Sequence, residues 1–483
     1  MATYYILIAS VLLLLGILSS KVSERFGIPA LILFMGIGML AGSDGIGGIY
    51  FDDAGLAKFI GTIALIYILF SGALETDWVS IKPVLSRGIV LSSLGVLITA
   101  GLVGFFACVA LKFPPKEGFL LGAIVSSTDA AAVFAILRSR NLGLRGNLKP
   151  LLEFESGSND PMAIFLTITA IGILDSSLFN AVDMISSFAL SMSFGALAGV
   201  GFGKVSSYAL NKIRLDYEGL YPVLSMSIVL LVYSVAESLR GNGFLAVYLF
   251  GLVLGNNDFI YKRNLIRFHN GLAWLMQITM FTILGLLVYP SHLPGVAGPG
   301  LLISAFLMLA ARPIAVFLCL IKSSFSLKEQ LLVALVGLRG SVPIVLAMFP
   351  LAAGYPGSDR MFNIVFFVVL TSVLLQGKLL LPLARWLKLY YPLVNKPRYP
   401  LEFDKTHDVD TQTREYEILP ESSVVGKNIS QIGLPKDALV LLIRRGNRFV
   451  VPRGNTKLEP YDTLMVLAEL EDLHAVREIL RGV

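Results

Sequence analysis

The chain carries little charge for its length. Of its 483 residues, 15% are Asp, Glu, Lys or Arg and 55% are hydrophobic, against about 25% and 45–50% in an average soluble protein. So few charged side chains cannot cover a water-soluble globule of this size, and lipid must therefore solvate most of the chain. The composition excludes a secreted globular protein, a nucleic-acid-binding protein and a coiled coil.

Other chemical signatures are missing as well. The two cysteines, Cys108 and Cys319, both lie in apolar runs, so we expect no disulfide framework. The chain has no Walker loop, which argues against an ATP-driven pump. We expect neither a histidine relay nor a histidine-cysteine metal cluster, because the histidines fall outside the expected membrane spans, at positions 269, 292, 407 and 474.

Apolar runs long enough to cross about 30 Å of hydrocarbon recur through the first 388 residues. We expect thirteen membrane-spanning helices, at 3–20, 27–42, 58–74, 88–111, 117–137, 150–174, 184–203, 219–236, 243–256, 271–289, 299–321, 328–350 and 361–387. The loops on one side of this series hold sixteen Lys and Arg, and those on the other side hold four. Because cytoplasmic loops are rich in positive charge, we expect the N-terminus outside and the C-terminus in the cytoplasm.

The composition changes after residue 388. Residues 389–413 mix proline with charge and show no period, which indicates a linker. Residues 414–483 predict strands in "EYEIL" and "DTLMVLAE", a hairpin in "ALVLLIRRGNRFVVP" that turns at Gly446-Asn447, and a closing helix in "LEDLHAVREIL". The sequence thus predicts a transmembrane domain at 1–388, a linker, and a small cytosolic α+β domain at 414–483.

Two expected spans contain polar or helix-breaking residues at mid-depth. The span at 117–137 holds "SSTD", and the span at 328–350 holds Arg339 between two glycines, with a proline at 343. Each alone could be a packing kink, but a shift of 211 residues aligns the two segments. Interrupted segments at corresponding positions are typical of an inverted repeat. We therefore expect two broken helices whose free carbonyl groups an ion or a facing side chain must satisfy.

The span at 150–174 carries the ionisable groups. A charge at mid-membrane costs at least about 2.5–3.5 kcal/mol, so each one needs a reason. Glu155 and Asn159 lie on one helix face, with Asp160 about 100° around the helix. We expect Glu155 to pair with Arg339 and to hold two spans together. Asp160 is then left without a permanent cation, so a proton and an alkali cation can compete for it, and a site that holds either but not both can exchange them.

Other interpretations of these residues stay open. Asp160 precedes a proline and could be a helix N-cap. Asp129 could cap the half-helix that begins at the break, or it could balance the charge of that half-helix. Arg312 and Lys378 also fall within expected spans, and we interpret them as snorkelling or packing residues and not as ion contacts. Glu75, at the end of an expected span, has no assigned role.

Three segments, "STDAAAV", "ESGSNDP" and "GLRGSVPIVLA", resemble in their joint spacing the signatures of the NhaP/NHE-like monovalent cation:proton antiporters. The resemblance covers about residues 5–388. It implies an all-α, NhaA-like antiporter fold of about 13 transmembrane helices, with inverted repeats and two broken helices that cross. It also implies a homodimer in the bacterial inner membrane that is a transporter, not an enzyme, and that needs no cofactor.

The resemblance implies an ion site on two neighbouring spans, where Asp160 binds the cation or the proton, surrounded by Asn159, Ser156, Thr128 and Asp129. It also implies a structural ion pair in the core between Glu155 and Arg339. The Asn-Asp pair at 159–160, in place of two aspartates, resembles the electroneutral branch of the family. One departure is Ser71, in "FSGAL", where many relatives have a glutamate.

The tail resembles a TrkA-C (RCK_C) domain, which implies a small cytosolic regulatory ligand. Together the two parts resemble bacterial potassium/proton antiporters of the NhaP type. The expected partners are potassium, with sodium as the second candidate, protons, membrane lipid and a second copy of the chain, and no nucleic acid. Sodium or lithium as the main cation, a ligand-gated potassium channel and a non-transporting sensor remain alternatives. The chain has no "TVGYG"-like filter, which argues against the channel.

Overall fold

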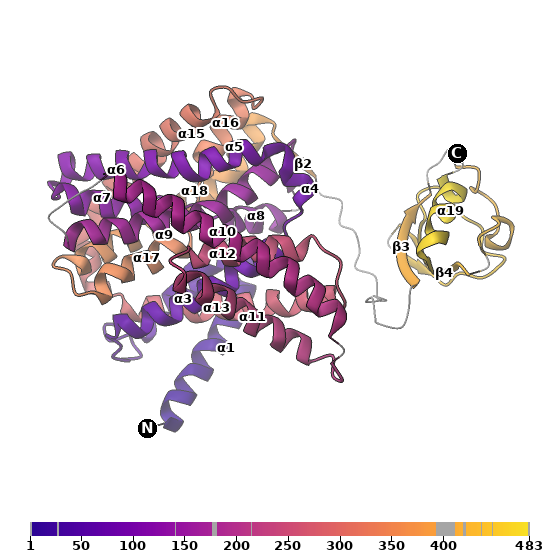
Figure 1. Cartoon of the computed structure of the whole chain (residues 1–483), viewed down its shortest axis with the longest axis horizontal. Coiled ribbons are helices and arrows are strands. Elements are labelled where there is room, and N and C mark those ends of the chain that lie inside the picture. The colour runs from indigo at the N-terminus through magenta and orange to yellow at the C-terminus, as the bar shows by residue number, and fades with distance from the viewer. Residues whose placement is uncertain are drawn as a thin grey trace. The chain divides into compact units, whose positions relative to one another are not determined.

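The computed structural model describes residues 2–26, 29–140, 142–175, 181–213, 215–392, 411–418, 422–435, 437–446 and 448–481. They belong to two compact units, a helical unit that ends at Val394 and a C-terminal unit that contains Asn395–Val483. Figure 1 shows long helices packed side by side in the first unit, and a small sheet with helix α19 (Leu470–Arg481) in the second.

The helical unit follows the predicted hydropathy pattern. Its helices are α1 (Ala2–Phe26), α2 (Ala30–Ala41), α3 (Ala54–Leu74), α4 (Trp78–Ile81), α5 (Leu85–Val90), α6 (Val96–Leu111), α7 (Pro115–Ile124), α8 (Ala130–Ser139), α9 (Leu148–Asp175), α10 (Ala181–Lys212), α11 (Leu220–Ser238), α12 (Gly243–Gly255), α13 (Lys262–Leu287), α14 (Leu293–Phe306), α15 (Arg312–Leu320), α16 (Leu327–Leu335), α17 (Ser341–Ala352) and α18 (Ser358–Leu387). Within the described ranges, nine helical segments are long and apolar enough to cross a membrane, and α2, α12 and α17 are shorter apolar helices. The chain is thus a multi-pass membrane protein, as its composition predicts.

Both predicted interruptions are present. Helix α7 ends at Ile124 and α8 begins at Ala130, while α16 ends at Leu335 and α17 begins at Ser341. The amide of Asp129 donates a hydrogen bond to the carbonyl of Leu338 at 2.7 Å. The two interruptions therefore lie against each other, so each can supply groups that the other lacks.

One histidine is not where the sequence analysis expects it. Helix α13 starts at Lys262, nine residues before the expected span, and His269 is fully buried inside it. Its Nε2 lies 2.7 Å from the Ser225 hydroxyl, and its ring packs edge-on against Phe70. The expectation was wrong because the first turns of α13 are polar on one face. Average hydropathy therefore starts the span too late, although the other face is buried.

A short antiparallel pair of strands joins two distant loops of the helical unit. Strand β1 (Leu142–Leu144) lies between α8 and α9, and β2 (Tyr390–Pro392) follows α18. Strand β2 falls inside the segment 389–413 that the sequence predicts as a linker. Proline content led to that prediction, yet Pro392 occupies the last position of a strand.

The C-terminal unit is a four-stranded antiparallel sheet with the strand order β3-β6-β4-β5. Its strands are β3 (Thr411–Glu417), β4 (Leu439–Arg445), β5 (Arg448–Val450) and β6 (Thr463–Glu469). The predicted strands, hairpin and closing helix are all present. Gly446 has a φ of +57°, as a tight hairpin turn requires, whereas Asn447 lies outside the described residues.

A charged cluster stabilises the C-terminal end of strand β4. Arg445 donates hydrogen bonds to both carboxylate oxygens of Asp462, at 3.0 and 2.9 Å, and Asp462 is fully buried. Bonding to this carboxylate raises the pKa of Arg445 above its ordinary value. The guanidinium therefore stays charged and links β4 to the turn before β6.

Candidate functional site

The free carbonyl groups of the first interruption are bound by an arginine of the second. Arg339 Nη1 donates to the carbonyls of Ser126 and Ser127, at 2.6 and 2.5 Å. The Arg339 side chain is 1% exposed. A guanidinium has several donors and remains charged without water, so it can satisfy the carbonyls that lipid cannot. A facing side chain was one of the two solutions that the sequence predicts.

Asp160 lies beside the same interruption. It is 6% exposed, and its Oδ1 accepts a hydrogen bond of 2.5 Å from the hydroxyl of Ser127. Because α9 begins at Leu148, Asp160 is inside the helix and not at its N-terminus, so the alternative of an N-cap is wrong. Among the described residues, no arginine or lysine forms an ion pair with Asp160.

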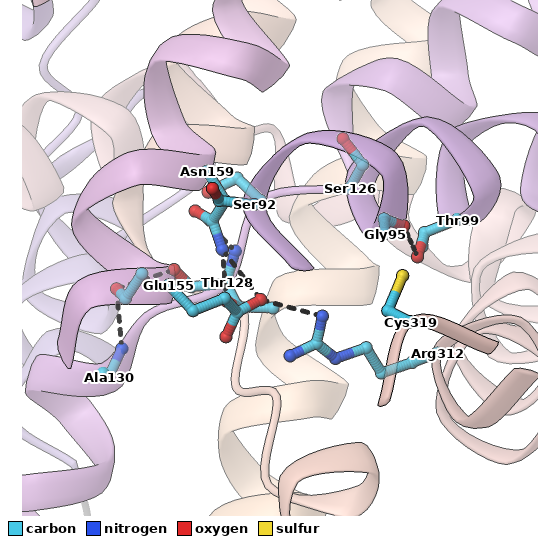
Figure 2. A network of polar contacts seen from close by, with 12 residues as sticks. Ser92, Gly95, Thr99, Ser126, Thr128, Ala130, Glu155, Asn159, Arg312 and Cys319 are labelled. Carbon is cyan, nitrogen blue, oxygen red and sulfur yellow. Dashed lines mark hydrogen bonds and ion pairs between the residues drawn. The ribbon is translucent and has the colours of Figure 1, made fainter. Parts of the chain in front are cut away.

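Asn159 faces Thr128 and Glu155 (Figure 2). Its Nδ2 donates to Thr128 Oγ1 at 2.5 Å and to Glu155 Oε1 at 3.3 Å, and its Oδ1 accepts from the Thr128 amide at 3.4 Å. Asn159 therefore fixes the backbone and the hydroxyl of the interruption. Among the hydrogen bonds of the described residues, none joins the Asn159 side chain to the carboxylate of Asp160.

Ser156 binds the backbone at the α8 end of the interruption. Its hydroxyl donates to the carbonyl of Thr128 and accepts from the amide of Ala130, both at 3.0 Å. Ala130 is the first residue of α8, whose first amides have no partners within the helix. The serine thus connects α9 to the start of α8.

Asp129 is the cap of that half-helix. Its Oδ1 accepts a hydrogen bond of 3.2 Å from the amide of Ala132, and the carboxylate lies directly over the backbone of Gly340. A Cβ atom on Gly340 would collide with this carboxylate, so glycine is needed at this crossing. Of the two interpretations that the sequence leaves open for Asp129, the geometry supports the cap.

The buried ion pair differs from the expected one. Glu155 pairs with Arg312, with 2.8 Å between Oε1 and Nη1, and not with Arg339. Both side chains are 2% exposed. Figure 2 shows Glu155 between Asn159 and the Arg312 guanidinium, with Cys319 of the same helix nearby. The expectation that Arg312 is only a snorkelling or packing residue was therefore wrong.

The position of Arg312 explains the difference. It begins α15, directly after a π-helical turn at Leu307–Ala311. Its Nε lies against the backbone of Gly337, next to the second interruption. Arg312 therefore reaches Glu155 from the side, while the bonds that Arg339 makes to carbonyls hold that guanidinium elsewhere. Among the described residues, Arg312 Nε and Nη2 have no hydrogen-bond partner.

Three further polar positions, Ser71, Glu75 and Lys378, lie apart from this cluster. Ser71, where a glutamate is usual, is buried and donates a hydrogen bond of 2.7 Å to Asn270 Oδ1. Asn270 Nδ2 in turn donates to the exposed Glu75, at 2.5 Å. Lys378 is exposed on α18, as a snorkelling residue would be. The structure shows no hydrogen bond or ion pair between any of these groups and Asp160.

Sequence reasoning left Ser127 out of the site, although it bonds directly to Asp160. The available signal was its place in "SSTD", where two adjacent serines precede the threonine and the aspartate. The sequence could not show which serine faces α9, because the backbone is not helical there. Ser126 instead donates to the carbonyl of Ala123.

Two known family models match the chain. The model of the transmembrane sodium/hydrogen exchanger family matches residues 9–386, and the TrkA-C domain model matches residues 413–481. The chain belongs to the sodium/hydrogen exchanger family. As the sequence predicts, its membrane part resembles transporters and its tail resembles a TrkA-C domain.

Relatives and solved structures agree with this assignment. The chain is 38% identical to the K(+)/H(+) antiporter NhaP of Alkalimonas amylolytica, over 98% of this chain and 83% of that protein. It is 39% identical, with the same coverage, to the K(+)/H(+) antiporter NhaP2 of a Shewanella species. Its fold is similar to that of the sodium proton antiporter MjNhaP1 of Methanocaldococcus jannaschii, with a TM-score of 0.70 and 28% identity over 80% of this chain and 99% of that one. These relatives are transporters and not enzymes.

Proposed function

We propose that the protein is an electroneutral secondary antiporter that exchanges cytosolic potassium for protons by alternating access. Exchange of this kind serves potassium and pH homeostasis. The names of the two relatives above support potassium as the cation. The observation that carries the proposal is the charge of the cluster around the two interruptions.

That cluster lacks one positive charge. It contains three carboxylates and two guanidiniums: Asp129, Glu155 and Asp160, with Arg312 and Arg339. One monovalent cation or one proton makes it neutral, and both together would leave an excess of positive charge. In a medium of low dielectric such an excess is costly, so the two ions exclude each other.

The proposed position for the ion is Asp160. Its carboxylate has a hydroxyl neighbour, Ser127, and no cationic partner among the described residues. Pro161 follows inside α9 and has no amide proton, so the carbonyl of Gly157 lacks its usual helical donor. A carboxylate, a hydroxyl and a free carbonyl are the oxygen ligands that an alkali cation needs once it has lost water.

The remaining residues are proposed to position this site. Asn159, Ser156 and Thr128 hold the first interruption against α9, and Asp129 caps α8. The proposed core ion pair is now between Glu155 and Arg312, because the expected partner Arg339 binds carbonyl groups. Asp160 alone would then change its occupant during transport.

The finer architecture is also a proposal. It comprises thirteen crossings with inverted repeats in an NhaA-like fold, and a homodimer in the bacterial inner membrane with its N-terminus outside and its C-terminus in the cytoplasm. We propose a transmembrane domain at 1–388, a linker at 389–413 that includes strand β2 and the first residues of β3, and a regulatory domain at 414–483. The expected alternation of positive loops supports this topology, and the two interruptions support the repeat.

The tail offers a place for a small ligand. A cavity of about 410 Å³ lies in the C-terminal unit, bordered by Ile429, Leu434, Pro435, Pro452 and Arg453. Its lining residues combine apolar side chains with the basic Arg453, so we propose a small ligand with an acidic group. This supports a regulatory role for the tail.

A second candidate function keeps the mechanism but makes sodium or lithium the main cation. The solved structure described above is that of a sodium proton antiporter, which favours this alternative. Exchange measured in turn with potassium, sodium and lithium in proteoliposomes would separate the two, since the ratio of kcat/KM values defines the preferred cation.

The role of Asp160 is tested by Asp160→Asn in proteoliposomes with an imposed pH gradient. An amide cannot release a proton, so we expect potassium-proton exchange to fall to the background of empty vesicles. The matched control is Asp216→Asn, the same change at an exposed loop position, which should exchange like the unmodified protein. Retained exchange in Asp160→Asn would contradict the proposed site.

The electroneutral mechanism needs a second measurement. At a clamped membrane potential, the exchange rate should not change with voltage, and the purified protein should carry no net current. A steady potassium current without counter-movement of protons would instead show a channel. The two outcomes are exclusive, because one proton per potassium ion moves no net charge.

A further inference from the structure

The β1–β2 strand pair joins the ion-site helices to the chain that enters the tail. Strand β1 connects α8 to α9. The cap Asp129 directly precedes α8, and Asp160 lies within α9. Strand β2 connects α18 to residues 393–410, which lead into the C-terminal unit. We call this pair, Leu142–Leu144 with Tyr390–Pro392, the latch.

The latch is held by regular antiparallel pairing. Leu144 lies opposite Tyr390, and Gly143 opposite Tyr391. The amide of Arg145 donates to the carbonyl of Leu389 at 3.0 Å, which makes these two a hydrogen-bonded pair. Because such pairs alternate along an antiparallel ladder, Gly143 with Tyr391 is hydrogen-bonded, and Leu144 with Tyr390 is not.

The contacts of the latch are close and partly buried. A Cβ atom on Gly143 would lie 2.5 Å from the Tyr391 ring, so only glycine lets the ring rest on β1. Leu144 is 4% exposed and belongs to the same apolar core as Leu148 of α9 and Leu380 of α18. The latch is thus packed onto the helices that it connects.

Its attachments are short. Only residues 140–141 separate α8 from β1, and residues 145–147 separate β1 from α9. On the other side, Lys388 ends α18 in a left-handed conformation, with φ of +59°, and the amide of Leu389 donates to the carbonyl of Ala384. This is a compact helix end followed directly by a strand. A displacement at β2 must therefore be taken up by α8 and α9.

We infer that the latch is the route by which the cytosolic tail controls exchange. The inference rests on the proposed antiport function. A conformational change in the tail displaces β2, where the linker begins. The hydrogen bonds of the ladder transmit this displacement to β1, and β1 transmits it to α8, next to Asp129, and to α9, which holds Asp160. When the latch is locked, the tail no longer has an effect.

A cross-link tests this directly. Leu144→Cys/Tyr390→Cys places two cysteines in a non-hydrogen-bonded pair, where the Cβ atoms are close enough for a disulfide. A cleavage site for a specific protease is inserted between residues 395 and 410 of the full-length chain, which is reconstituted and then cut. Exchange is measured before and after cutting, in oxidised and reduced protein. Leu144→Cys alone is the control for the cysteine and for the oxidant.

We expect cutting to change the exchange rate of the reduced protein by about fivefold or more, a typical lower value for allosteric coupling. The oxidised protein should show the same rate before and after cutting. An equal change in both states would overturn the inference, since the tail would act by another route. An unchanged rate in the reduced protein would overturn it as well.

Amide hydrogen exchange at residues 142–145 gives a readout that does not depend on transport. Cutting the tail should speed the exchange of these amides in the reduced protein, and unchanged protection would count against the latch. Absence of ion exchange in the uncut protein would instead refute the proposed function, so the two failures can be told apart.

A matched pair of proline variants gives an independent test in the uncut protein. Gly143→Pro disrupts the latch in two ways, because it removes an amide that donates to β2 and adds a Cβ atom that displaces the Tyr391 ring. Leu142→Pro changes a position opposite Pro392 where no ladder bond is made. Gly143→Pro should reproduce the effect of cutting and Leu142→Pro should not. Equal effects of the two would show that the ladder is not the route.

Discussion

The two carboxylates of α9 are close in sequence and opposite in surroundings. Glu155 is 1% exposed and forms an ion pair with Arg312. Asp160 is 6% exposed, and among the described residues its bonded neighbour is the hydroxyl of Ser127. A buried carboxylate with a guanidinium keeps its charge permanently, while one with only a hydroxyl must find a cation or a proton. The helix therefore carries one structural and one exchangeable charge.

The two buried arginines repeat this contrast. Arg312 neutralises a carboxylate, and Arg339 binds the carbonyls of Ser126 and Ser127. Both have the same chemistry, so their roles follow from what faces them. Substitutions at these positions therefore test which buried charge is structural and which is exchangeable.

The largest effect on stability is expected for Arg312→Ala. It leaves the Glu155 carboxylate buried and unpaired, which costs about 3–5 kcal/mol of unfolding free energy and should lower the thermal midpoint in detergent. Glu155→Gln/Arg312→Ala should be more stable than Arg312→Ala, because no buried charge is left over. Strictly additive losses in this double-mutant cycle would show that the two side chains are not coupled.

Arg339→Met should cost less, about 2–3 kcal/mol, because it removes charged hydrogen bonds to two carbonyls but breaks no ion pair. The same thermal measurement checks it. Glu155→Gln/Arg339→Met is expected to be additive here, unlike the pair with Arg312. A clear rescue by Glu155→Gln would return Arg339 to the role of ion-pair partner.

Asp129→Ala should cost about 0.5–2 kcal/mol, the usual value for an N-cap. Asp129→Asn keeps an acceptor for the Ala132 amide and should lose less, as measured by thermal midpoint. If both variants are equally unstable, the negative charge of Asp129 matters more than its capping hydrogen bond.

The smallest effect on stability is expected for Ser127→Ala, below about 1 kcal/mol, although it should raise the KM for potassium severalfold by removing an oxygen next to Asp160. Ser126→Ala is the matched control, because that neighbouring hydroxyl is equally buried and bonds to the carbonyl of Ala123. Equal KM values in the two variants would exclude the Ser127 hydroxyl from the ion site.

The course of the chain through the membrane was largely predictable. Apolar length identified the helices, and the combination of "SSTD" with a glycine-flanked Arg339 identified both interruptions. The start of α13 was missed, because a helix that is polar on one face and buried on the other, as at His269, has a low average hydropathy.

Within the candidate site, the choice among similar groups was not predictable. Arg312 and Arg339 are both far from Glu155 in the chain, and their position relative to α9 depends on a π-helical turn and on the crossing at Gly340. The sequence could not distinguish the role of Ser127 from that of Ser126 either. In an interrupted segment no helical period shows which hydroxyl faces inward.

Composition, hydropathy and the spacing of polar residues were enough to predict a multi-pass helical protein with a separate C-terminal α+β domain and a carboxylate within an apolar helix, because each is a property of the chain read in order. Only the tertiary structure decided that Glu155 meets Arg312, that Ser127 meets Asp160, and that β1 pairs with β2. Contacts between segments so far apart in sequence depend on how whole helices pack.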